Sequence, residues 1–198
     1  MVYAVKFLSF RDVLQEYHEI EDISEEMYDE VYYLRCCKNN LTNIDFIAFF
    51  PNLKYLDASY NKLKTCISHD NLEVLDIYNN NLVSLPLFPK LKKLFAFNNN
   101  ILILSYNDDL EVLDVSHNVI KLLEIGPNLK NCYCGFNTIG RINVKGYKLT
   151  ILECNNNYLS SLSFILSLPH LQKMYYYDNK FLKNIEKDVK NKLVLLEI

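Results

Sequence analysis

The sequence has no tryptophan and very little glycine or proline, with 4 Gly and 5 Pro in 198 residues. This scarcity excludes collagen-like, elastic and proline-rich disordered architectures. An excess of charge of one sign is also lacking, since 21 Lys and Arg against 24 Asp and Glu leave a net charge of −3. Without a basic surplus to neutralise phosphates, nucleic acid is not an expected partner.

Long hydrophobic runs are absent as well. No segment approaches the roughly 20 apolar residues of a membrane span, and residues 1–10 do not resemble a secretory signal peptide. We therefore expect an intracellular protein without membrane insertion. In that setting six cysteines do not predict a disulfide framework, so we expect free thiols. What the chain does have is 50% hydrophobic residues, enough for one folded domain.

An internal repeat dominates the sequence. Residues 72–82 and 110–120 fit the pattern Leu-x-x-Leu-x-Leu-x-x-Asn-x-Leu, with Val or Ile allowed for Leu. The template fits eight units, which open at Val31, Leu53, Leu72, Leu91, Leu110, Leu129, Leu149 and Leu171. Position nine is asparagine in all of them: Asn39, Asn61, Asn80, Asn99, Asn118, Asn137, Asn157 and Asn179. Units of 19 to 22 residues cannot bury their own apolar faces, so stacking must make the core.

This pattern resembles the leucine-rich repeat family over about residues 31–181. The resemblance implies an α/β solenoid, a right-handed superhelix with a parallel concave β-sheet of about eight strands. It implies one continuous domain with an N-terminal cap (1–30), eight repeats (31–181) and a C-terminal cap (182–198). In the family the recurring asparagines form a ladder, and a short amide can satisfy the backbone groups of each turn.

Repeat length predicts the convex backs. The 22-residue units are similar to the repeats of phosphatase regulatory subunits, which implies a short helical or 3₁₀ back. The 19-residue units between them resemble those of bacterial leucine-rich effectors, and they are too short for a helix, so their backs should be extended. After the last repeat, Ile185, Val189, Leu193 and Leu196 keep helical spacing and should cover the end of the core.

The cysteines mostly fall on inward positions. Positions four, six and eleven point into the core, and Cys36, Cys132, Cys134 and Cys154 occupy four or six, while Cys66 occupies position fourteen. Only Cys37 should face solvent. Cys132, Cys134 and Cys154 imitate a zinc cluster, but core positions explain their spacing and no histidine is near in sequence. We expect no metal and no cofactor.

Two sets of residues could carry catalysis. Asp57 and Asp76 share position five of neighbouring repeats, about 5 Å apart on adjacent strands, as in a hydrolase with paired carboxylates. Asp114, Ser116 and His117 include the residue types of a catalytic triad, but a run on one strand cannot surround a substrate. Aspartate at position five is common in the family, so we expect no enzyme.

The predicted concave face carries aromatic and acidic residues. Strand alternation sends positions three, five and seven to this face. The candidate binding residues are Tyr33, Arg35, Tyr55, Asp57, Asp76, Tyr78, Phe95, Phe97, Asp114, Ser116, Tyr133, Gly135, Glu153, Tyr175 and Tyr177. Folding does not require aromatics in water, although neighbouring rings could simply stack and stabilise the sheet. Aromatic anchors among acids are typical of a protein-binding face, with a dip expected at Ser116 and Gly135.

The sequence therefore favours a non-catalytic scaffold or adaptor that holds a protein or peptide partner with basic residues. Two specific versions stay open: the substrate-recognition subunit of a ubiquitin-ligase-type effector, and a phosphatase-regulator-like subunit. A hydrolase using Asp57 and Asp76 is the third alternative.

Overall fold

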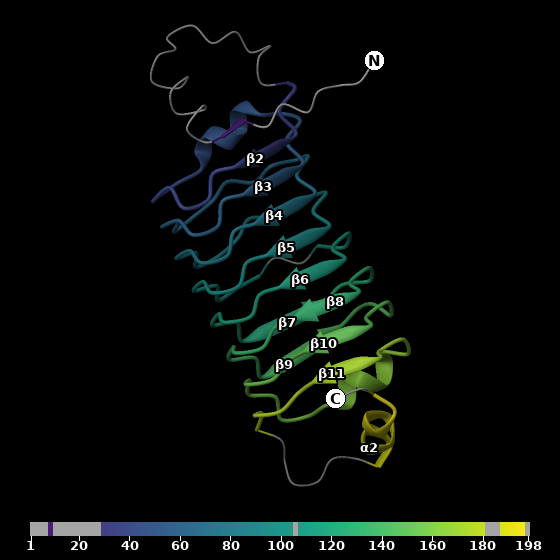
Figure 1. Ribbon diagram of the computed structural model, residues 1–198. Helices are drawn as coiled ribbons and strands as arrows, with labels where there is room; N and C mark the ends of the chain where they lie inside the picture. The colour runs from purple at the N-terminus through teal and green to yellow at the C-terminus, as the bar shows by residue number, and fades with distance from the viewer. Residues whose placement is uncertain (1–7, 10–28, 105–106, 181–186, 197–198) are drawn as a thin grey trace, which may run out of the picture.

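The computed structural model is a solenoid of stacked coils (Figure 1). It describes residues 8–9, 29–104, 107–180 and 187–196. The N-terminal cap expected at 1–30 lies almost wholly outside these residues, as does Ile185 of the helical spacing expected after the last repeat. Within the described residues the predicted fold class, a repeat solenoid with a parallel sheet, is confirmed.

One strand per coil builds the main sheet. Its nine parallel strands follow the order β1 (Leu8–Ser9), β2 (Tyr33–Arg35), β3 (Tyr55–Asp57), β4 (Val74–Asp76), β5 (Lys93–Phe95), β6 (Val112–Asp114), β8 (Asn131–Tyr133), β10 (Ile151–Glu153) and β11 (Lys173–Tyr175). Eight of the strands belong to the repeats. The ninth, β1, precedes the repeats and pairs with β2, so the sheet is one strand longer than the repeat pattern predicts. Its solvent-facing side is the surface called the concave face below.

The backs of the coils follow repeat length. The first and seventh repeats, both 22 residues long, carry 3₁₀ turns η2 (Asp45–Phe49) and η3 (Ser163–Ser167). Shorter repeats have extended backs: β7 (Leu122–Ile125) pairs with β9 (Arg141–Val144), and Ser84 bridges to Ile103. The predictions of 3₁₀ backs in the 22-residue repeats and extended backs in the 19-residue repeats are therefore confirmed. The three additional residues of the longer repeats supply the chain that a 3₁₀ turn needs.

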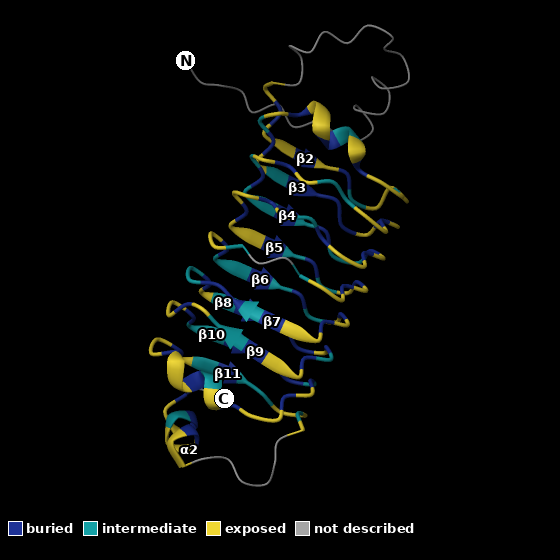
Figure 2. Cartoon of the chain, turned by 180° about the vertical axis from the view of Figure 1, so that it is seen from behind, coloured by how far each residue is buried: buried dark blue, intermediate teal, exposed yellow. Residues whose placement is uncertain are grey.

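The core runs as one column through the stack. Positions four and six are buried in repeats one to seven, and position eleven from Leu63 to Leu159 (Figure 2). In the first and last repeats, Leu41 and Tyr176 are only partly buried and pack against this core. Helix α2 (Lys187–Val194) packs Val189 and Leu193 inward beside η3, as its helical spacing predicts.

The asparagine ladder ties each coil to the next. Asn99 accepts a hydrogen bond from the N–H of Leu82 (3.0 Å) and donates to the carbonyls of Ile77 and Ala96 (3.1 Å each). Asn118 repeats this arrangement one coil further along. The predicted ladder is therefore confirmed, and its rungs satisfy backbone groups that have left the strand and lie in the core.

Replacing Asn99 or Asn118 with Ala should lower the free energy of unfolding by about 1–3 kcal/mol for each buried backbone group left unpaired. Chemical denaturation monitored by circular dichroism measures this loss. The matched control is Asn100→Ala, since Asn100 is exposed and its side chain lies outside the ladder. Equal stability of the Asn99, Asn118 and Asn100 variants would contradict the structural role of the ladder.

The concave face as candidate functional site

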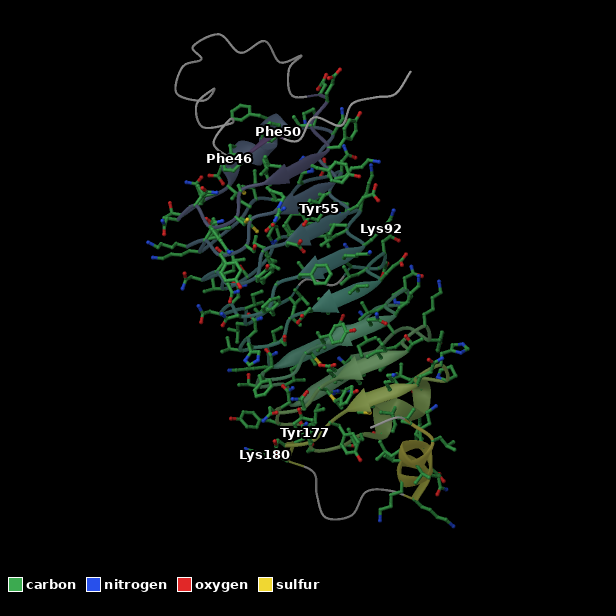
Figure 3. All side chains as sticks on the ribbon, viewed as in Figure 1. Phe46, Phe50, Tyr55, Lys92, Tyr177 and Lys180 are labelled. Atoms are coloured by element: carbon green, nitrogen blue, oxygen red, sulfur yellow. The ribbon has the colours of Figure 1, made fainter. Side chains whose placement is uncertain are left out.

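Position five forms an unbroken row across the concave face. The strand register places these residues side by side in the order Arg35, Asp57, Asp76, Phe95, Asp114, Tyr133, Glu153 and Tyr175. Tyr55 lies near one end of the sheet and Tyr177 near the other (Figure 3). The register thus brings together residues that are up to 140 positions apart, which the repeat spacing predicted.

At the N-terminal end of the row the carboxylates have partners within the face. Asp57 is 6% exposed and meets Nε of Arg35 at 3.3 Å, and it accepts a hydrogen bond of 2.6 Å from the hydroxyl of Ser59. Asp76 accepts one of 2.6 Å from the Tyr55 hydroxyl. Burial raises the pKa of Asp76, and the hydrogen bond from Tyr55 opposes this increase. Asp57 is thus held by two side chains, an arrangement typical of structural support, whereas Asp76 has one side-chain donor, the Tyr55 hydroxyl.

Asp114, Ser116 and His117 do not form a relay. The backbone N–H and the hydroxyl of Ser116 both donate to Oδ1 of Asp114, at 3.1 and 2.7 Å. The ring of His117 instead stacks on Phe136, with centroids 4.3 Å apart and planes 8° from parallel. The serine hydroxyl therefore points its proton at the aspartate and not at the histidine, which is the reverse of what nucleophile activation requires.

The C-terminal half of the row is an acidic and aromatic surface. Tyr133 lies between Asp114 and Glu153 in the register. Burial raises the pKa of Glu153, and the negative charge of Asp114 adds to the rise. Burial also raises the pKa of the Tyr133 hydroxyl, with Glu153 next in effect. These shifts indicate that the carboxylates are partly desolvated and lie close enough to repel each other.

The aromatic rings of the concave face are less exposed to solvent than the sequence predicted. Tyr33 and Tyr177 are 41% and 56% exposed, but the other six predicted aromatics are half-buried: Tyr55, Tyr78, Phe95, Phe97, Tyr133 and Tyr175. One reason is stacking, as Tyr78 and Phe97 are parallel within 10° at 4.3 Å and Tyr60 meets Tyr78 edge-on at 5.3 Å. The rings both support each other and present their outer surfaces.

The dip expected at Gly135 is occupied. A Cβ atom at Gly135 would lie only 2.8 Å from Oδ1 of Asn155, whose side chain leans over the glycine and is 4% exposed. The space between Tyr133 and Tyr175 is therefore shallower than the sequence predicted. Asn155 is a part of the face that sequence reasoning did not single out, although its place at position seven beside a glycine was the available signal.

The rim of the face has an unusual backbone. Position eight has a positive φ in all eight repeats, and none of these residues is glycine. Asn79, Asn98 and Asn156 suit this conformation, but Tyr60 and Phe136 adopt it at φ 53° and 54°. Left-handed backbone costs about 1–2 kcal/mol for a side chain that cannot bond locally. Because every repeat has this conformation at position eight, it belongs to the geometry of the coil, and Tyr60 and Phe136 adopt it at that cost.

The cysteines follow the core pattern with one exception. All six are free, and Cys36, Cys132, Cys134 and Cys154 are buried. Cys66, expected in the core, is partly exposed, as is Cys37. Among the described residues no group of three or more His, Cys, Asp or Glu is placed to hold a metal ion.

A second exposed surface lies on the backs of repeats three to five. It consists of Val83, Leu102, Ile103 and Leu122, which are 43% to 69% exposed. Ile103 is one partner of the Ser84–Ile103 bridge, Val83 and Leu102 are next to the bridged residues in sequence, and Leu122 is the first residue of β7. The sequence template gave no role to positions twelve and thirteen, so this apolar patch was not predicted. No helix in the described part of the chain is long and apolar enough to cross a membrane.

Comparisons with known proteins support the fold. The Leucine Rich Repeat family model matches residues 71–94. The leucine-rich repeat domain of APL1B superposes with a TM-score of 0.76 at 20% identity, covering 98% of this chain and 66% of that one. YopM, a leucine-rich effector protein from Yersinia pestis, gives 0.67 at 27% identity over 76% of this chain and 44% of that one.

A third structure, the LRIM1/APL1C complex, gives a TM-score of 0.60 at 18% identity over 96% of this chain and 52% of that one. No curated protein matches the sequence. The chain thus has the leucine-rich-repeat fold that its asparagine and leucine pattern predicted. It spans between 44% and 66% of the length of these three chains.

The thiols provide a direct test of the core assignment. A thiol reagent at pH 8 should label Cys37 first. Cys66 should react far more slowly, because burial raises its pKa to about 12 and leaves little thiolate. The four buried thiols should react only on unfolding. Peptide mapping by mass spectrometry measures the order, and native labelling of Cys132 as fast as Cys37 would show that the core is wrongly assigned.

The rim strain can be tested by Phe136→Asn. Asparagine adopts the same backbone at positions 79, 98 and 156, so the change relieves strain and loses only a stack on exposed His117. The melting temperature should stay equal or rise. Phe97→Asn is the control, since Phe97 has no positive φ and stacks on Tyr78; that variant should melt lower. A lower melting temperature for both would mean that Phe136 is not strained.

Proposed function

We propose that this protein is a non-catalytic binding scaffold whose concave face holds a protein or peptide partner. The observation that carries the proposal is the row of aromatic and acidic residues at position five, continuous over six strands from Asp76 to Tyr175. Rings that present a surface without deep burial are typical anchors of protein interfaces. Carboxylates between them favour a partner with lysine or arginine.

The size of the face is sufficient for such a role. Strands about 4.8 Å apart give the eight repeat strands a span of roughly 35 Å, which matches a standard interface. The solved LRIM1/APL1C structure, which is similar to this chain, is a complex of two proteins. That likeness supports a protein partner in preference to a small molecule. The near-neutral charge supports the same choice over nucleic acid.

One more specific version has an observation in its favour. The extended backs of the 19-residue repeats and the 27% identity with a leucine-rich effector support a recognition subunit of effector type. The 3₁₀ backs of the 22-residue repeats support the phosphatase-regulator-like version less, because among the described residues they occur in two repeats, the first and the seventh. The hydrolase alternative is disfavoured by the bonds that occupy Asp57 and Asp76.

The proposal is tested by truncating two anchors on the concave face. Tyr133→Ala with Tyr175→Ala should weaken binding by at least about 2 kcal/mol, as truncated hot spots do. The partner is first captured by crosslinking to the wild-type protein, and its affinity is then measured by calorimetry.

The matched control replaces two exposed residues on the backs, Lys121→Ala with Arg141→Ala. Both double variants should keep the circular dichroism spectrum of the wild type. Loss of binding in the control and not in the tyrosine variant would place the interface on the opposite side of the solenoid.

A further inference from the structure

Acids and rings alternate along the C-terminal part of the position-five row. Over six consecutive strands the register reads Asp76, Phe95, Asp114, Tyr133, Glu153 and Tyr175. Every second strand thus presents a carboxylate, and the strand between presents an aromatic ring. The repeat template does not require this alternation, because it specifies no residue type at position five.

None of the three carboxylates of this row forms an ion pair among the described residues, although the charge of Arg35, two strands away, acts on Asp76. Four other acids do form ion pairs: Glu73, Glu111 and Glu124 each lie 2.7 Å from a lysine nitrogen, and Asp57 lies 3.3 Å from Nε of Arg35. Asp76 and Asp114 bond only to uncharged hydroxyl and amide donors of the face. Half-buried carboxylates that form no ion pair within the protein are suited to a cation supplied by a partner.

The spacing of the carboxylates selects the conformation of the partner. Parallel strands lie about 4.7–4.9 Å apart, so carboxylates on every second strand are about 9.4–9.8 Å apart. A polyproline II helix advances about 9.3 Å in three residues and returns to the same face. An α-helix reaches the same face after seven residues at about 10.5 Å. A β-strand repeats a face at about 6.7 or 13.4 Å and fits neither spacing.

We propose that the row from Asp76 to Tyr175 binds a basic polyproline II segment with Lys or Arg at every third residue. This inference rests on the proposed function and names the conformation and charge of the partner. From Asp76 through Asp114 to Glu153 there are two intervals. Over both, the repeat of a polyproline II helix differs from the carboxylate spacing by less than about 1 Å, whereas the repeat of an α-helix differs by about 2 Å. The pyrrolidine rings between the cations pack against Phe95, Tyr133 and Tyr175, the kind of surface that recognises polyproline elsewhere.

The probe is the nonapeptide acetyl-Arg-Pro-Pro-Arg-Pro-Pro-Arg-Pro-Pro-amide. A second nonapeptide has the same composition, with Arg at positions 1, 3 and 8, so that no two arginines are three apart. Because net charge and proline content are equal, only the period differs. The first peptide should bind about tenfold tighter than the second, because it can form two additional ion pairs with the row. Titration calorimetry at low salt measures both affinities.

Two charge-matched variants locate the effect. Asp114→Asn with Glu153→Gln should bring the two affinities together. Glu111→Gln with Glu124→Gln removes the same charge from acids that pair with lysines off the row, and should preserve the difference. Equal binding of both peptides to the wild type overturns the inference. So does tighter binding of a helical peptide with arginines seven residues apart.

The proposed function fails by a different result. If the two peptides bind equally but the Tyr133 and Tyr175 double variant still loses the captured partner, the concave face binds a partner of another conformation. If the double variant keeps its partner, the face is not the interface, whatever the peptides do.

Discussion

Hydrogen bonding of the turn backbone by asparagine is the constraint on which the rest of the structure depends. A coil that leaves its strand must bring N–H and C=O groups through the interior, where they cannot remain unpaired. Asn61, Asn80, Asn99, Asn118, Asn137 and Asn157 supply the partners and are all nearly buried. Because each amide reaches both its own coil and its neighbour, it also fixes the register in which the strands align.

The concave face divides into two chemically different parts as a result of that register. Near its N-terminal end Arg35, Asp57 and Ser59 satisfy one another, so this part stabilises the sheet. Toward the C-terminal end Asp114 and Glu153 share a partly desolvated environment with Tyr133 between them. Asp57 is neutralised by Arg35, whereas Asp114 and Glu153 form no ion pair among the described residues, so the two parts of one continuous surface differ in charge.

The period of leucine and asparagine determined the coils, the core column and the order of the concave rows, because these depend only on which residues share a template position. Features that depend on neighbours in space were not predictable. Asn155 covers Gly135 through a contact between adjacent coils, and Cys66 is partly exposed although its position fits the core. The strained backbone of Tyr60 and Phe136 was hidden because aromatic residues give no turn signal.

Because equivalent positions align from coil to coil, equivalent residues recur at a constant spacing along the solenoid. Each coil touches only its neighbours, so coils can be gained or lost without disturbing the rest. Duplication of two 19-residue repeats would lengthen the position-five row by one further pair of residues, about 9.6 Å. Under the proposed function, the length of partner that the face contacts would therefore change in fixed increments as repeats are gained or lost.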